Sequence, residues 1–141
     1  MKYLKLLIFV LIGSFSQAQQ EKNILHNIIE AVSENRLNED IKTLANFGTR
    51  HTLSDTLSTT RGIGAARRWI KTEFETISKK CNNCLEVFYQ KNLVKSGENN
   101  RIIKDVWVVN VVAIQRGTKH PNRFIVMSGD IDSRVSDPNN F

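Results

Sequence analysis

Val106-Trp107-Val108-Val109-Asn110-Val111-Val112-Ala113-Ile114 is the stretch of sequence that decides the fold. Six of its nine residues are β-branched, and Asn110 is the single polar residue in the run. Such a nearly continuous apolar run is typical of a strand that is buried on both faces of a sheet. We therefore expect cover on both sides of that sheet, and we interpret Asn110 as a hydrogen-bonded structural residue.

Two further segments have the pattern of strands. Leu85–Gln90 is a short strand pattern, and Phe124–Met127 is a fully apolar run. The polar turn at Arg116–Asn122 is too short to hold a crossover helix, so we predict an antiparallel hairpin between 106–114 and 124–127, within a larger mixed sheet. The polar segment Asn92–Lys104 is predicted to be an exposed loop.

The chain before these strands has helical periodicity. Helices are predicted over residues 23–32 and 37–45, with Gly48 closing the second. The third pattern has the clearest apolar stripe, formed by Ile63, Ala66, Ile70, Phe74 and Ile77. Thr59 or Thr60 is expected to cap that helix, and the small residues Gly64–Ala66 would let a neighbouring backbone approach closely. The sequence thus predicts an α/β fold, with amino-terminal helices and part of a mixed β-sheet.

The chain has two cysteines, in Cys81-Asn82-Asn83-Cys84. A redox-active pair would be expected to open a helix, whereas this pair follows a predicted helix and precedes a strand. A four-cysteine zinc site is excluded because there is no second pair. We therefore predict a structural disulfide between Cys81 and Cys84.

The amino terminus has the pattern of a secretory signal peptide. Lys2 and Lys5 precede the apolar run Leu6–Ile12, and Ser16 and Ala18 are the small residues before a cleavage site. The run is too short for a membrane span. We expect a signal peptide at 1–18 and a domain from residue 19 to 141, exported to the periplasm, the cell surface or the medium.

Loss of Lys2 and Lys5 lowers the formal net charge from +6 to +4. The remaining basic residues are scattered among acids, without the clustered basic face and interleaved aromatic residues of nucleic-acid-binding proteins. We therefore expect neither a nucleic-acid partner nor a membrane span after the signal peptide is removed.

Carboxylates follow the last apolar run, in Ser128-Gly129-Asp130-Ile131-Asp132-Ser133. Acids at the carboxyl end of a buried strand suit a metal site, because ligands bind at that edge in open α/β folds. A polar turn whose aspartates accept backbone hydrogen bonds remains the alternative. His26, His51 and His120 have no metal-binding spacing and are interpreted as surface residues.

Four segments, in one unbroken order over roughly residues 37–137, resemble the family 28 metallopeptidases, which are di-zinc aminopeptidases. The segments are Leu44–Ser54 (LANFGTRHTLS), Gly62–Ile70 (GIGAARRWI), Val109–Gly117 (VNVVAIQRG) and Val126–Arg134 (VMSGDIDSR). The resemblance implies a zinc-exopeptidase-like three-layer fold, with two zinc ions at the carboxyl edge of its central mixed sheet. It also implies peptide substrates.

The resemblance assigns Asp130 as a metal ligand and Asp132 as the acid that supports it. The family's usual motif is G-H-x-D-S, so Asp130 stands where a zinc-binding histidine is usual. Aspartate is also a zinc ligand, although the exchange could equally accompany an altered or absent metal.

The family's other ligands and its general base lie further along the chain than Phe141. We therefore interpret the sequence as the amino-terminal part of a zinc aminopeptidase, inactive by itself, with no catalytic residue of its own. Two alternatives stay open: a glutaminyl-cyclase-like acyltransferase on the same scaffold, and a non-catalytic exported binding module.

Overall fold

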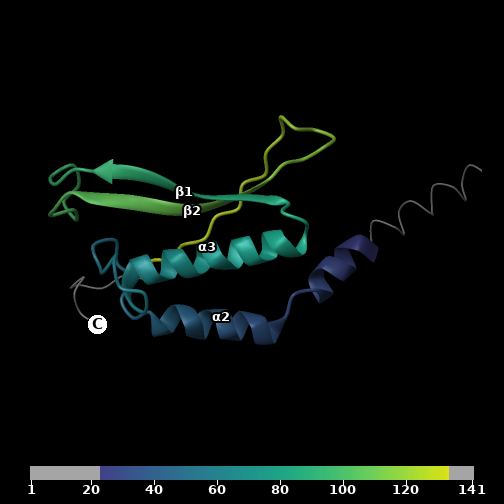
Figure 1. Ribbon diagram of the computed structural model, residues 1–141, viewed down its shortest axis with the longest axis horizontal. Coiled ribbons are helices and arrows are strands. Elements are labelled where there is room, and N and C mark those ends of the chain that lie inside the picture. The colour runs from purple at the N-terminus through teal and green to yellow at the C-terminus, as the bar shows by residue number, and fades with distance from the viewer. Residues whose placement is uncertain (1–22, 134–141) are drawn as a thin grey trace, which may run out of the picture. The chain divides into compact units, whose positions relative to one another are not determined.

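The computed structural model describes residues 23–133 (Figure 1), which divide into two units between Asp40 and Ile41. The predicted signal peptide lies outside the described residues. In the first unit, residues 23–30 are helical, as predicted, and the apolar side chains of residues 24–32 are exposed. Helix α2 (Glu34–Asn46) begins in this unit, where Ser33 Oγ accepts a hydrogen bond from the Arg36 N–H at 3.2 Å.

The second unit is built on an antiparallel hairpin. Strand β1 (Leu85–Val94) pairs with β2 (Val106–Gln115), with Leu85 opposite Gln115 and Val94 opposite Val106. Helix α3 (Gly62–Lys80) packs against both strands (Figure 1). This combination confirms the α/β prediction. None of the helices between residues 23 and 133 has the length and apolar character needed to span a bilayer.

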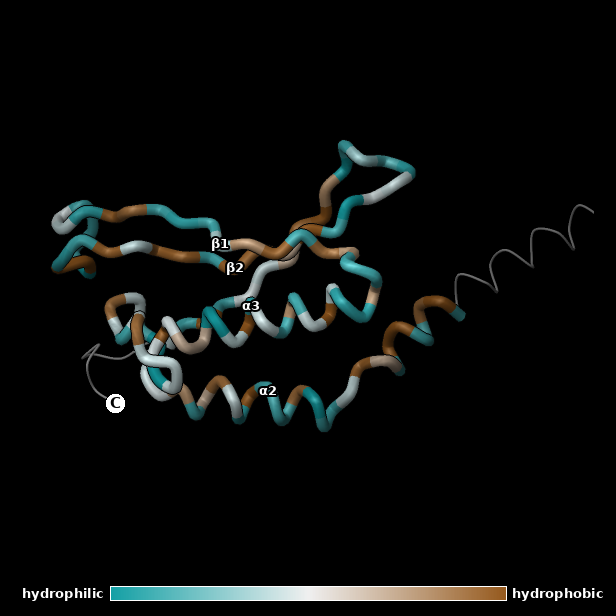
Figure 2. The backbone as a smooth tube through the Cα atoms, viewed as in Figure 1, coloured by the Kyte–Doolittle hydropathy of each residue, from teal (hydrophilic) through white to brown (hydrophobic). Residues whose placement is uncertain are grey.

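The two faces of the hairpin differ in their surroundings. Tyr89 lies on the face toward α3, because the Lys71 ammonium of that helix is 5.7 Å from its ring centroid. On the opposite face, Asn110 Nδ2 donates a hydrogen bond to Gln90 Oε1 at 2.7 Å, which confirms the structural interpretation of Asn110. Figure 2 shows the apolar stretch along β2 beside a more mixed β1.

The predicted partner of the 106–114 strand was wrong. That strand pairs with β1, and Phe124–Met127 forms no strand. The side chains of Phe124–Met127 are 82–94% exposed rather than buried. A segment forms a β-strand only when a neighbouring strand exchanges backbone hydrogen bonds with it. Among the described residues no strand pairs with Phe124–Met127. For the same reason β2 is half-buried rather than buried on both faces.

The free backbone N–H groups in the first turn of α3 find their hydrogen-bond acceptors in the preceding loop rather than in the N-cap residue. The N-cap is Arg61, without a side-chain capping hydrogen bond, so the prediction of Thr59 or Thr60 was wrong. Instead the Ile63 N–H donates to Ser54 Oγ at 3.0 Å. The Gly62 and Gly64 N–H groups donate to the Phe47 and Asp55 carbonyls at 2.9 and 3.1 Å. The preceding loop thus supplies the acceptors that a helix amino terminus needs.

Two glycines allow this close approach. A Cβ on Gly64 would lie 2.2 Å from the Thr56 carbonyl oxygen, and one on Gly62 would lie 2.4 Å from that of Asp55. Gly62 also has φ +74°, a conformation that favours glycine. The expected close backbone approach at the small residues of this helix is confirmed. Ile63, Ala65 and Ala66 are buried beside it and form much of the core.

The link from α3 to β1 is closed by the predicted disulfide. Cys81 and Cys84 are bonded, with their Cα atoms 5.4 Å apart. Asn82 and Asn83 between them both have φ 59°, which asparagine tolerates better than most residues. The Ser78 hydroxyl also accepts a hydrogen bond from the Leu85 N–H at 3.1 Å. The end of the helix and the start of the strand are therefore held together by a covalent bond and a buried hydroxyl.

Gly64→Ala should strongly destabilise the second unit. The new methyl group would meet the Thr56 backbone, which cannot swing away as a flexible side chain can, and overpacking of this kind costs about 1–3 kcal/mol. We expect the free energy of unfolding in urea to fall by about 2 kcal/mol or more. Gly117→Ala is the matched control, because its Cβ would meet only the His120 oxygen at 3.9 Å. Equal stability of the two variants would contradict the close packing described here.

Candidate functional site

Arg50 connects the end of α2 to the acidic segment that follows residue 127. Its Nε donates to the Ile131 carbonyl at 2.8 Å, and its backbone N–H donates to Ser133 Oγ at 2.8 Å. The Ser133 N–H donates back to the Arg50 carbonyl at 3.3 Å. The Arg50 guanidinium also donates to the carbonyls of Leu44 and Gly48. The side chain and the backbone of Arg50 together therefore hold residues 131–133 against the loop that closes α2.

Asp130 and Asp132 flank the carbonyl that Arg50 binds. Both are exposed, and their segment has no regular secondary structure, so the expectation of a rigid strand end was wrong. The cause is the missing pairing of Phe124–Met127 described above. Arg50 replaces strand pairing as the element that positions these acids.

The described residues do not provide a complete set of zinc ligands. A catalytic zinc site usually has three protein ligands, and between residues 23 and 133 no three histidine, cysteine, aspartate or glutamate side chains group closely enough to hold a metal. Asp130 is an oxygen donor of a suitable kind, but among the described residues it belongs to no such group of three. We therefore assign no hydrolytic step to this part of the chain.

The role of Arg50 was not predicted, although the sequence contains a signal for it. Gly48 closes α2 with φ +67°, as predicted, and its N–H donates to the Ala45 carbonyl at 3.0 Å. A basic side chain just after such a glycine is well placed to donate to the last carbonyls of the helix. The long-range contacts with Ile131 and Ser133 have no local signature.

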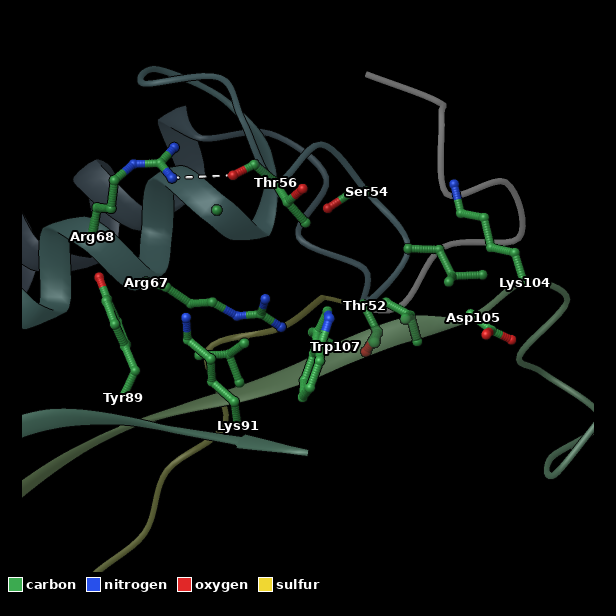
Figure 3. A pocket seen from close by; sticks show the side chains of 14 residues that line it. Thr52, Ser54, Thr56, Arg67, Arg68, Tyr89, Lys91, Lys104, Asp105 and Trp107 are labelled. Atoms are coloured by element: carbon green, nitrogen blue, oxygen red, sulfur yellow. Dashed lines mark hydrogen bonds between the residues drawn. The ribbon is translucent and has the colours of Figure 1, made fainter. Parts of the chain in front are cut away.

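A cavity of about 590 Å³ lies between α3, the loop before it and the hairpin (Figure 3). Its lining includes the buried Leu53 and Ser54, the aromatic rings of Tyr89 and Trp107, and the Arg67 side chain. Figure 3 shows Arg67 extending from the helix across the cavity toward Trp107. None of these residues was singled out as a site from the sequence.

The chain is similar to several proteins that are named probable zinc metalloprotease. It is 35% identical to one from Phaeosphaeria nodorum over 127 residues, which cover 90% of this chain and 26% of that protein. It is 39% identical over 117 residues to one from Pyrenophora teres f. teres, covering 83% and 24% of the two chains. With one from Pyricularia oryzae it shares 38% identity over 130 residues, covering 92% and 26%.

The chain therefore spans about a quarter of the length of these curated relatives. No family model matches it. No solved structure matches it either.

Arg50→Ala should release the acidic segment. Hydrogen bonds from charged groups contribute about 1.5–3 kcal/mol each, without simple additivity, so we expect the free energy of unfolding to fall by about 2–3 kcal/mol. Amide hydrogen exchange at Ser133 should accelerate, because the variant loses the side-chain hydrogen bond to the Ile131 carbonyl and keeps only the backbone contacts between residues 50 and 133. Arg116→Ala, which removes an exposed ion pair with Glu86, is the control and should cost at most about 1 kcal/mol. Unchanged exchange at Ser133 in the Arg50 variant would show that another contact holds the segment.

Proposed function

We propose that this chain is part of an exported zinc-dependent peptidase. The observation that supports the proposal is 35–39% identity with proteins named probable zinc metalloprotease over 83–92% of this chain. Because those proteins are about four times longer than the matched region, the activity is proposed for a protein of their length.

We further propose that the peptidase removes amino-terminal residues and uses two zinc ions. The four segments that resemble family 28 metallopeptidases support this narrower proposal. Asp130 would be a zinc ligand and Asp132 the acid that supports the metal site. The contacts of Arg50 with Ile131 and Ser133 are consistent with a segment whose position matters. Zinc, when bound, would supply Lewis-acid chemistry at the scissile carbonyl.

Export is supported by two features of the chain. One is the signal-peptide pattern of residues 1–18. The other is the Cys81–Cys84 disulfide, since disulfides persist in oxidising compartments outside the cytoplasm. Peptides outside the cytoplasm would then be the substrates.

The proposed export predicts a defined amino terminus. When the gene is expressed in its own host, the exported protein should begin at Gln19, and its two cysteines should be unreactive to thiol reagents until a reductant is added. Intact-mass and peptide-map mass spectrometry would measure both. A cell-retained protein that begins at Met1 with free thiols would overturn the proposal.

Metal dependence predicts that Asp130→Ala lowers zinc affinity by at least about tenfold, the size of effect seen when groups that support a metal site are lost. Bound zinc would be measured by atomic emission, and activity by the hydrolysis of leucine p-nitroanilide. Both measurements would use the protein expressed from the complete gene or purified from its own host. Asp130→His should retain zinc, because histidine is also a zinc ligand. Glu98→Ala, in the exposed loop between the strands, is the control and should leave zinc content and activity unchanged.

Two outcomes would contradict this function. Hydrolysis that persists after removal of zinc by a chelator would exclude a metal-dependent mechanism. Cleavage of amino-terminally acetylated peptides as fast as free ones would exclude an aminopeptidase while leaving a zinc peptidase possible.

A further inference from the structure

Arg67 is a buried cation with an unused hydrogen-bond donor. Its side chain extends from α3 into the cavity of Figure 3, and the residue is 8% exposed. Its Nε finds no hydrogen-bond acceptor within the part of the chain that the structure describes. Burial lowers the pKa of Arg67, an effect that the nearby Tyr89 opposes, yet a guanidinium stays charged in proteins. A buried charge without a partner is costly, which makes an anionic partner favourable.

Two of the other charged groups around the cavity are already engaged. The Arg68 guanidinium donates to the carbonyls of Thr56, Leu57 and Ser58. Asp105, the one acid in the lining, accepts from Lys95 Nζ at 2.8 Å and from the Ser96 N–H at 2.9 Å. The acid that could neutralise Arg67 is therefore bound elsewhere.

The remaining charge around Arg67 is positive. Lys91 lies in the lining, with its ammonium 6.0 Å from the Tyr89 ring centroid, and Lys104 lies at the same cavity. Together with Arg67 and Arg68 they give four basic side chains against the single acid. The field inside the cavity thus attracts an anion.

Part of the cavity wall is apolar and aromatic. Leu53 is 7% exposed, and Val106 and Val109 of β2 are half-buried. Tyr89 and Trp107 project from opposite strands on the same face of the hairpin. The volume of about 590 Å³ lies within the usual range of about 300–1,000 Å³ for small-molecule sites. These side chains offer an organic body contacts that a bare inorganic ion would not use.

We propose that this cavity binds an organic carboxylate, with the carboxylate on the Arg67 guanidinium and the apolar body against Tyr89 and Trp107. The planar fork of arginine matches a carboxylate. The apolar and aromatic part of the wall favours an organic carboxylate over inorganic phosphate. The site uses neither Asp130 nor zinc, so it stands independently of the proposed peptidase.

The test compares an acid with its uncharged amide. Isothermal titration calorimetry of the full chain, with a chelator present to exclude metal, would use N-acetyl-leucine and N-acetyl-leucinamide as probes. We expect the acid to bind at least about tenfold more tightly than the amide. Acetate should bind more weakly than N-acetyl-leucine, because it lacks the apolar body.

Arg67→Gln should abolish the preference for the acid, while Arg116→Gln, outside the cavity, should keep it. Arg67→Lys retains a charge without the fork and should bind the acid more weakly than the unchanged protein. Fluorescence of Trp107, recorded in a Trp69→Phe background, should change on addition of the acid. It provides a second readout if the Arg67 variants fold poorly.

Three results would overturn the proposal. One is equal binding of acid and amide. Another is inorganic phosphate binding as tightly as N-acetyl-leucine, which would indicate a general anion site. The last is no binding of the acid at millimolar concentration, which would be expected if an acidic side chain of the protein itself occupied the cavity.

Discussion

The packing of residues 54–56 against the first turns of α3 is the constraint on which the rest of the second unit depends. Ser54 and the carbonyls of Phe47 and Asp55 satisfy the first N–H groups of that helix. The contact is possible only because Gly62 and Gly64 have no side chains to separate the two backbones. The same loop contributes Leu53 and Ser54 to the cavity, so one packing contact shapes both the helix start and the site.

Arg50 and Arg67 show two different ways of accommodating a guanidinium in one small unit. Arg50 distributes its donors over the carbonyls of Leu44, Gly48 and Ile131, and is thereby a structural clamp. Arg67 is buried with its Nε donor unused by the described residues. Because unsatisfied buried donors cost about 1–3 kcal/mol, and more when charged, the rest of the unit must offset that cost. Only the second arginine therefore retains the capacity to bind something else.

The helices and the disulfide could be predicted from the sequence because their determinants are local. The apolar stripe from Ile63 to Ile77 requires only a 3.6-residue repeat, and Gly48 marks the end of α2 by its backbone freedom alone. The Cys81–Cys84 bond joins residues three apart, so no knowledge of the tertiary fold was needed. The predicted cap of α3 was wrong for the opposite reason. The groups that accept hydrogen bonds from the first N–H groups of α3 lie up to fifteen residues away, whereas Thr59 and Thr60 were the nearest candidates in sequence.

The sheet and the acidic segment could be predicted less well, because apolar character specifies burial but not a partner. Val106–Gln115 and Phe124–Met127 are both apolar, yet only the first finds a strand among the described residues. Once Phe124–Met127 is unpaired, a D-x-D pattern no longer marks a sheet edge, and the position of Asp130 and Asp132 depends on Arg50, some eighty residues earlier. A contact at that separation leaves no periodicity or turn signal in either segment. For this reason the acids were recognised as candidates from the sequence, whereas the residue that positions them emerged only from the structure.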